Sequence, residues 1–183
     1  MKALKVILII IGILIVIILG MYAYYGGFRK IDFKVEKQGR ETIVYENVIG
    51  DYSQTPKYTD KIYYALLNDE KIETTKGIGI FYDNPQEVDK DKLRSEVGCI
   101  LDNTDDAILA QLSGKHQIKT LPEADYIVTE FPMKGAMSFM VSVIRVYPAL
   151  NKYCKEHGYK DSPITEIYDI SNKKIVYRKE VIK

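Results

Sequence analysis

The sequence predicts an α+β domain made of two copies of a βαββ unit, preceded by one membrane-spanning helix. Three observations predict this: an uncharged apolar segment near the N-terminus, strand-like alternation interrupted by two amphipathic helical patterns, and a repeat of that order along the chain. With 183 residues and 46% apolar side chains, the chain is long enough for one domain with a substantial core.

Residues 6–25 contain no charged side chain. As a helix this segment would be about 30 Å long, which is the thickness of the hydrocarbon core of a bilayer. The alternative is a secretory signal peptide, which needs small residues at its cleavage site. Tyr22, Tyr24 and Tyr25 stand there instead, and their rings suit a membrane interface. We therefore expect residues 1–30 to be an uncleaved anchor and residues 31–183 a globular domain.

The charges that flank this segment indicate its orientation. Lys2 and Lys5 precede it together with the α-amino group, whereas five cations follow it, namely Arg29, Lys30, Lys34, Lys37 and Arg40. Positive charge favours the cytosolic side, so we expect a single-pass membrane protein with a cytosolic body. The opposite orientation, with the body outside, remains the alternative.

The first half of the body alternates strands and a helix. Residues 31–36 and 42–48 show period-two alternation, and Gly50 breaks the run. Apolar residues at helical spacing predict a helix over residues 55–67. Strands are expected at 78–82 and 97–101, separated by a polar turn or loop over 85–95. A short helix is expected around 107–112.

The second half follows the same order. Residues 124–131 read as a strand that Pro132 ends, and residues 136–156 form the longest helical pattern. Pro148 is expected to kink this helix and Gly158 to cap it. Strands at 164–168 and 175–181 complete the chain.

These elements form a repeat. Strand, glycine-containing break, helix, strand, turn and strand occur from about Thr42 to Leu101 and again from about Asp125 to Ile182. Ile80-Phe81-Tyr82-Asp83 in the first copy corresponds to Glu166-Ile167-Tyr168-Asp169 in the second. Two related units that each have a half-buried sheet are expected to pack about a pseudo-twofold axis, with a cleft where they meet.

This correspondence draws attention to Glu166, whose counterpart is Ile80. If its side chain lies on the apolar face with Ile164 and Tyr168, the carboxylate must find a partner or raise its pKa. It would then be a counter-ion for a cationic or polar ligand, or a general base. The alternative is that Glu166 points to solvent and Ile167 faces the core.

Aromatic residues are expected around that carboxylate. Tyr82 is the counterpart of Tyr168 and is expected on the same face across the pseudo-axis, where aromatic rings attract cations. Phe139, on the long helix, is either a packing residue or part of the cleft. The candidate ligand-binding residues are therefore Glu166, Tyr168, Tyr82, Ile80 and Phe139.

Several function classes are not expected. The body is weakly acidic, which disfavours nucleic acid as a partner. Cys99 and Cys154 form no zinc or disulfide pattern and are expected to be buried. Phosphate-binding glycine loops and the common hydrolase motifs are missing from the sequence. We expect no metal and no cofactor.

Three segments resemble the GyrI-like small-molecule-binding domain family, which also supplies the effector-binding domains of AraC-type and MerR-type regulators. They are Gly79–Pro85, Lys92–Gly98 and Pro163–Tyr168. The resemblance implies a duplicated βαββ fold of the SHS2 type, a glutamate in the central cleft that Glu166 matches, and hydrophobic, often cationic, ligands. Some members resemble hydrolases that open cyclopropanoid rings with a Glu and a Tyr, roles that could fall here on Glu166 and either Tyr82 or Tyr168.

Within the family, the membrane helix together with Arg145–Tyr153 is most similar to a membrane-anchored receptor of ER-phagy. Such receptors use a long acidic tail, whereas this sequence stops at Lys183, so receptor function by that route is not expected. We expect a membrane-anchored domain that binds a small hydrophobic or cationic ligand, and we do not expect an enzyme. The alternatives are a hydrolase that uses Glu166, and a membrane-tethered adaptor or receptor.

Overall fold

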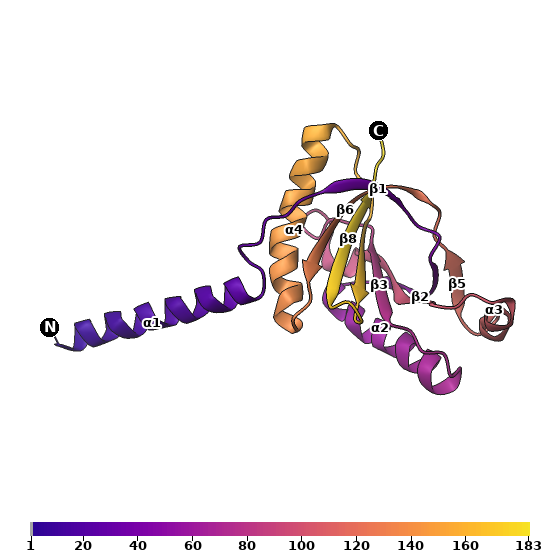
Figure 1. Ribbon diagram of the computed structural model, residues 1–183, viewed down its shortest axis with the longest axis horizontal. Coiled ribbons are helices and arrows are strands. Elements are labelled where there is room, and N and C mark those ends of the chain that lie inside the picture. Colours follow the sequence, from indigo (N-terminus) through magenta and orange to yellow (C-terminus); the bar gives the residue numbers. More distant parts are fainter. Residues whose placement is uncertain (1) are drawn as a thin grey trace.

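The computed structural model describes residues 2–183 and confirms an α+β fold. A long helix, α1, projects from a body in which helices pack on a strongly curved antiparallel sheet (Figure 1). The helices are α1 Lys2–Tyr24, α2 Thr55–Tyr64, α3 Asp106–Leu112 and α4 Ala136–His157. The strands are β1 Lys34–Gln38, β2 Thr42–Ile49, β3 Lys76–Phe81, β4 Arg94–Ile100, β5 Gln117–Thr120, β6 Ala124–Pro132, β7 Ile164–Asp169 and β8 Lys174–Glu180.

The sheet shows the expected duplication. Its strand order is β1-β6-β8-β7-β3-β4-β2-β5, so that β2-α2-β3-β4 and β6-α4-β7-β8 are two βαββ units placed side by side. The units meet at β3 and β7, which pair antiparallel with Gly79 opposite Glu166 and Ile78 opposite Ile167. We call this pairing the seam.

Short links between distant strands force the sheet to curve. β1 lies at one edge and β2 next to the other, yet only residues 39–41 connect them. Six strand spacings of about 4.8 Å would separate β1 and β2 by roughly 29 Å in a flat sheet. Three linking residues reach at most about 15 Å. The two edges must therefore approach each other. Residues 121–123, which link β5 to β6, are equally short, and the Arg40 amide donates to the Leu121 carbonyl where this link meets the β1–β2 link.

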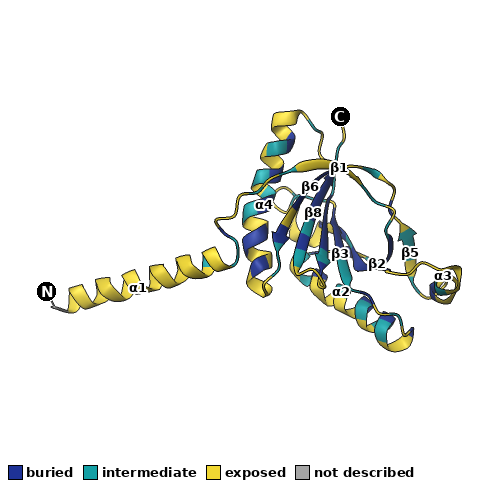
Figure 2. Ribbon diagram, in the orientation of Figure 1, coloured by how far each residue is buried: buried dark blue, intermediate teal, exposed yellow. Residues whose placement is uncertain are grey.

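The two faces of the sheet are filled differently. α2 and α4 cover the convex face. Ile62 of α2 and Leu66 of the π-helical turn that follows it pack on Val44 and Cys99, and Leu150 of α4 packs in a second cluster. The concave face holds a core rich in isoleucine, namely Ile43, Ile78, Ile80, Ile100 and Ile167 with Leu121. Figure 2 shows this burial along the strands.

A buried ion pair connects the concave face to the link that closes it. Arg178 of β8 is fully buried, donates to both carboxylate oxygens of Glu41 at 2.7 and 3.1 Å, and lies over the Tyr126 ring. Glu41 belongs to the β1–β2 link. The pair therefore joins the middle of the sheet to the segment that brings its edges together.

Most expected elements are present, with shifts at their ends. The strand expected at 31–36 lies at 34–38, and the α2 segment ends in a π-helical turn, Ala65–Asp69. β5 was not predicted, because its four residues are too few to establish a period-two pattern. Pro148 lies inside α4, and Gly158 caps that helix in the left-handed conformation as expected. Both cysteines are buried and free.

Removing the acid of the closing ion pair should destabilise the fold. Glu41→Ala leaves the buried Arg178 without its partner, and we expect the free energy of unfolding to fall by about 3 kcal/mol. Urea unfolding in detergent micelles, followed by tyrosine circular dichroism, measures this. Glu130→Ala breaks the exposed pair with Lys174 and should cost less than about 1 kcal/mol. Equal losses in the two variants would show that Arg178 does not depend on Glu41.

Candidate functional site

Glu166 lies on the convex face at the seam, with 5% of its surface exposed. Tyr147 of α4 donates a hydrogen bond to Oε1 at 2.6 Å, and Tyr168 of β7 donates to Oε2 at 2.8 Å. Each carboxylate oxygen therefore accepts one tyrosine hydroxyl. The expectation that this side chain shares a face with Tyr168 agrees with the geometry, and the solvent-facing alternative does not.

Glycines of β3 make room for the aromatic rings at the seam. A Cβ atom added to Gly77 would lie 3.3 Å from Cδ2 of Tyr168 and 3.5 Å from Cγ2 of Thr59 on α2. A Cβ on Gly79 would lie 2.8 Å from the ring of Phe81. The Tyr168 ring thus lies against bare backbone, between Thr59 on α2 and Phe139 on α4, whose ring centroid is 5.5 Å away.

A second layer of hydrogen bonds fixes the Glu166 surroundings. Tyr177, the direct partner of Glu166 on β8, shares a 2.6 Å hydrogen bond with the hydroxyl of Ser142. Ser142 in turn donates to the carbonyl of Phe139 at 2.8 Å. Since Tyr177 and Ser142 are almost completely buried, they hold α4 in place over the seam.

The carboxylate has hydrogen bonds but no counter-ion. In the described part of the chain, residues 2–183, no lysine, arginine or histidine forms an ion pair with Glu166. Burial raises the pKa of Glu166, and the hydrogen bonds from Tyr147 and Tyr168 offset part of that rise. Burial and the adjacent carboxylate raise the pKa of both tyrosines well above the usual value.

Two of the candidate residues lie elsewhere. Residues alternate between the faces of a strand, and Gly79 shares the face of Glu166, so Ile80 must point to the concave side. There it packs with Ile78 and Ile167. The expectation that Ile80 and Tyr82 share the face of Glu166 is therefore wrong.

Tyr82 follows Ile80 on the same side and is 39% exposed. Burial and the nearby Glu96 raise the pKa of its hydroxyl, and Glu96 is the strand partner of Ile80. The error lies in the alignment of the two copies, which is shifted by one residue. Because side chains alternate between the two faces of a strand, this shift exchanges the faces of the matched residues. An even offset of 86 residues matches Tyr82 to Tyr168, but the observed pairing needs an odd offset to keep the faces in register.

Glu166, Tyr168 and Phe139 are thus brought together, and three further residues join them. Tyr147, Gly77 and Gly79 were not among the site residues expected from the sequence. The alternating glycines in Lys76-Gly77-Ile78-Gly79 were the available signal, since glycine inside a strand marks a close approach by other groups. Tyr147 gave no comparable signal in a chain with 15 tyrosines.

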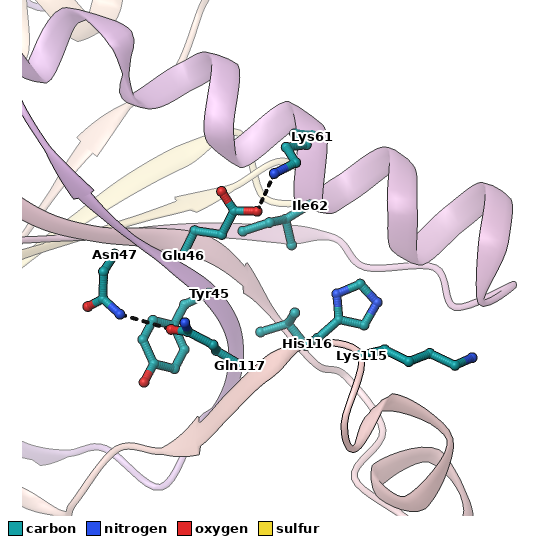
Figure 3. A pocket seen from close by; sticks show the side chains of 9 residues that line it. Tyr45, Glu46, Asn47, Lys61, Ile62, Lys115, His116 and Gln117 are labelled. Atoms are coloured by element: carbon teal, nitrogen blue, oxygen red, sulfur yellow. Dashed lines mark hydrogen bonds and ion pairs between the residues drawn. The ribbon is translucent and has the colours of Figure 1, made fainter.

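Two shallow hollows lie away from Glu166. One, of about 370 Å³, lies beside β2 and α2, where Lys61 pairs with Glu46 and Asn47 donates to Gln117 (Figure 3). The other, of about 290 Å³, lies between the segment after α1 and β6. The polar side chains drawn in the first hollow largely satisfy one another. At the seam itself, Tyr168 and Phe81 cover the floor that the β3 glycines form.

The family follows from a comparison with known domains. The model of the GyrI-like small molecule binding domain matches residues 32–180. The chain belongs to this family. Its duplicated βαββ sheet, with Glu166 at the seam, is the GyrI-like fold expected from the sequence.

Individual relatives are more distant. Testis-expressed protein 264 of Homo sapiens is 33% identical over 99 residues, which cover 51% of this chain and 32% of that protein. The chain therefore spans about a third of that relative's length. Two solved structures share the fold: the EcmrR C-terminal domain, with a TM-score of 0.60, 13% identity and coverage of 84% of this chain and 98% of that one, and SAV2435 bound to tetraphenylphosphonium, with a TM-score of 0.54, 14% identity and coverage of 83% and 94%.

The raised pKa of Glu166 predicts a pH dependence of stability. A carboxyl whose pKa is higher in the folded state stabilises the fold below the ordinary glutamate pKa, and this contribution is lost as pH rises through the raised value. Glu166→Gln cannot ionise. The free energy of unfolding of the wild type, relative to that of Glu166→Gln, should therefore fall as the pH rises above the ordinary glutamate pKa of about 4.3.

Urea unfolding in micelles across this pH range measures that difference, because contributions common to both proteins cancel. In a Tyr147→Phe background the fall should begin at the same pH and extend to higher pH, since one hydrogen bond that lowers the folded-state pKa of Glu166 is gone. A difference that is flat or rises with pH would mean that Glu166 is not destabilised by ionisation.

Proposed function

We propose that this chain is a membrane-anchored GyrI-like domain that binds a small organic cation at Glu166. The observation that carries the proposal is a buried carboxylate that has two hydroxyl donors and, within residues 2–183, no counter-ion. Burying a charge is costly unless an opposite charge compensates it. A cationic ligand would supply that charge.

The surroundings of Glu166 fit an apolar organic cation. Tyr147 and Tyr168 hydrogen-bond to the carboxylate, and the Phe139 ring packs edge-on against Tyr168. Aromatic faces attract cations and pack on apolar groups. Phe139 is 37% exposed and Tyr168 is half-buried, so both rings have surface that a ligand can contact beside the buried Glu166. The fold relative SAV2435 was solved with tetraphenylphosphonium, a cation of this class.

The same geometry favours binding over catalysis. A hydrolase that uses Glu166 as base would need a tyrosine as acid. The pKa values of Tyr147 and Tyr168 are raised well above the ordinary value, so both hydroxyls hold their protons more tightly than a free tyrosine. Both protons are also directed at Glu166 itself. This arrangement stabilises a carboxylate and provides a poor proton donor to a substrate.

The membrane part of the proposal rests on α1. Residues 3–24 form a helix that is long and apolar enough to cross a bilayer, and its large side chains are exposed along its length. Residues 1–30 would then be the anchor and residues 31–183 the binding domain, with the body on the cytosolic side because more cations follow the helix than precede it.

Binding of tetraphenylphosphonium tests the site. We expect the wild-type chain in detergent micelles to bind it, and Glu166→Gln to weaken binding by about tenfold or more because the compensating charge is lost. Isothermal titration calorimetry measures both affinities.

Tyr82→Phe is the matched control, since Tyr82 lies on the opposite face and its loss should leave the affinity unchanged. Equal affinity for the wild type and Glu166→Gln would contradict the proposed site. If no organic cation binds to either protein, a surface that recruits a protein becomes the better hypothesis. Turnover of a bound compound that stops in Glu166→Gln would instead favour the hydrolase.

Extraction from membranes tests the anchor. The full chain expressed in cells should remain with the membranes at alkaline pH, whereas a chain that starts at residue 31 should be released. Protease added to sealed microsomes should digest the body if it faces the cytosol. Release of the full chain would overturn the anchor, and protection of the body would reverse the orientation.

A further inference from the structure

The N-terminal half of α4 carries an apolar surface that no element of the fold covers. Met140 is 57% exposed and Ile144 is 60% exposed, and Met137 and Val143 are exposed beside them. The other side of the helix is buried against the sheet through Ser138, Val141, Ser142, Val146 and Leu150. The exposed apolar residues therefore point away from the sheet. We call Met137, Met140, Val143 and Ile144 the α4 face.

The end of α1 lies next to this helix. Tyr22 and Tyr25 pack against the core cluster that includes Val141. Lys134, just before α4, donates to the Tyr24 carbonyl at 2.8 Å and lies over its ring, and Arg145 donates to the Arg29 carbonyl at 3.1 Å. These contacts fix the level at which α1 leaves the body.

The arrangement of the two helices places the α4 face toward the bilayer. In Figure 1 the sheet lies on one side of α4 and α1 on the other, and α4 runs across the axis of α1 rather than along it. If α1 crosses the bilayer, α4 then lies along its surface. Its apolar residues, which point away from the sheet, point to the side on which α1 extends.

The charges around the α4 face fit the same surface. Lys134 and Arg145 flank the α4 face, and residues 131–155 contain no aspartate or glutamate. The one acid of α4, Glu156, lies near the far end of the helix, 3.8 Å from Lys152. A helix with an apolar face and cationic flanks is typical of one that lies in the headgroup region of an anionic membrane. The tyrosines at the end of α1 suit the same depth.

We infer that the α4 face docks on the surface of the bilayer that α1 spans. This inference rests on the proposed membrane anchor. Because Phe139 and Tyr147 belong to the same helix, docking brings the Glu166 site close to the lipid. An amphipathic cation dissolved in the membrane surface would then reach the site without crossing bulk water.

Single tryptophans test the docking, since the chain contains none. The full chain is reconstituted in vesicles of phosphatidylcholine with a minority of phosphatidylserine, carrying bromine either near the headgroup end or in the middle of the acyl chains. Ile144→Trp, with Met140→Trp as a second probe, reports on the α4 face. Tyr64→Trp, equally exposed on α2, is the control away from α1, and Ile13→Trp reports on α1. Tyrosine circular dichroism shows whether each variant is folded.

We expect shallow bromine to quench Ile144→Trp several-fold more strongly than Tyr64→Trp, and deep bromine to quench Ile13→Trp most strongly. Quenching of Ile13→Trp without quenching of Ile144→Trp and Met140→Trp would overturn the docking and leave the anchor intact. An unquenched, blue-shifted Ile144→Trp would mean that protein covers the face, which also overturns the inference. No quenching of Ile13→Trp would overturn the anchor itself.

Discussion

The hydrogen-bonded carboxylate of Glu166 is the feature around which the two halves of this domain are arranged. One oxygen accepts from Tyr147 on α4, the other from Tyr168 on β7, and the backbone opposite is Gly79 of the first unit. A charge buried without a counter-ion weakens a fold unless its hydrogen bonds are kept. Both hydroxyl donors belong to the second unit, and the first unit contributes the Gly79 backbone that pairs with Glu166 across the seam.

The curvature of the sheet separates this site from the stabilising core. Because the β1–β2 and β5–β6 links are short, the sheet closes on its concave side, where isoleucines and the Arg178–Glu41 pair provide a core that no ligand needs to enter. The convex side is left to α2 and α4, and between them the rings of Tyr168 and Phe139 remain partly exposed. The isoleucine core and Glu166 thus lie on opposite faces of the same strands, and the convex face carries core clusters of its own beneath α2 and α4.

The order of the elements was predictable from sequence, whereas the details of register were not. Helical spacing and strand alternation predicted α2, α4 and most strands because each has one buried face, and the repeat predicted two βαββ units. Glu166 could be selected because a charge interrupts an apolar strand. Tyr82 and Ile80 were misplaced because a shift of one residue in aligning the copies moves every side chain to the other face. Tyr147 contacts Glu166 only through the packing of α4, which spacing along the chain does not specify.

Proton release on ligand binding is the most direct test of the role of Glu166. A cation that binds beside a carboxyl with a raised pKa should lower that pKa and displace a proton at mildly acidic pH. Calorimetric titrations with tetraphenylphosphonium in buffers of different ionisation enthalpy measure the number of protons released. If Glu166 is the anchor, the wild type releases protons in a pH-dependent manner and Glu166→Gln releases none. Binding without proton release at every pH tested above the ordinary glutamate pKa, or equal release from the two proteins, would contradict this role.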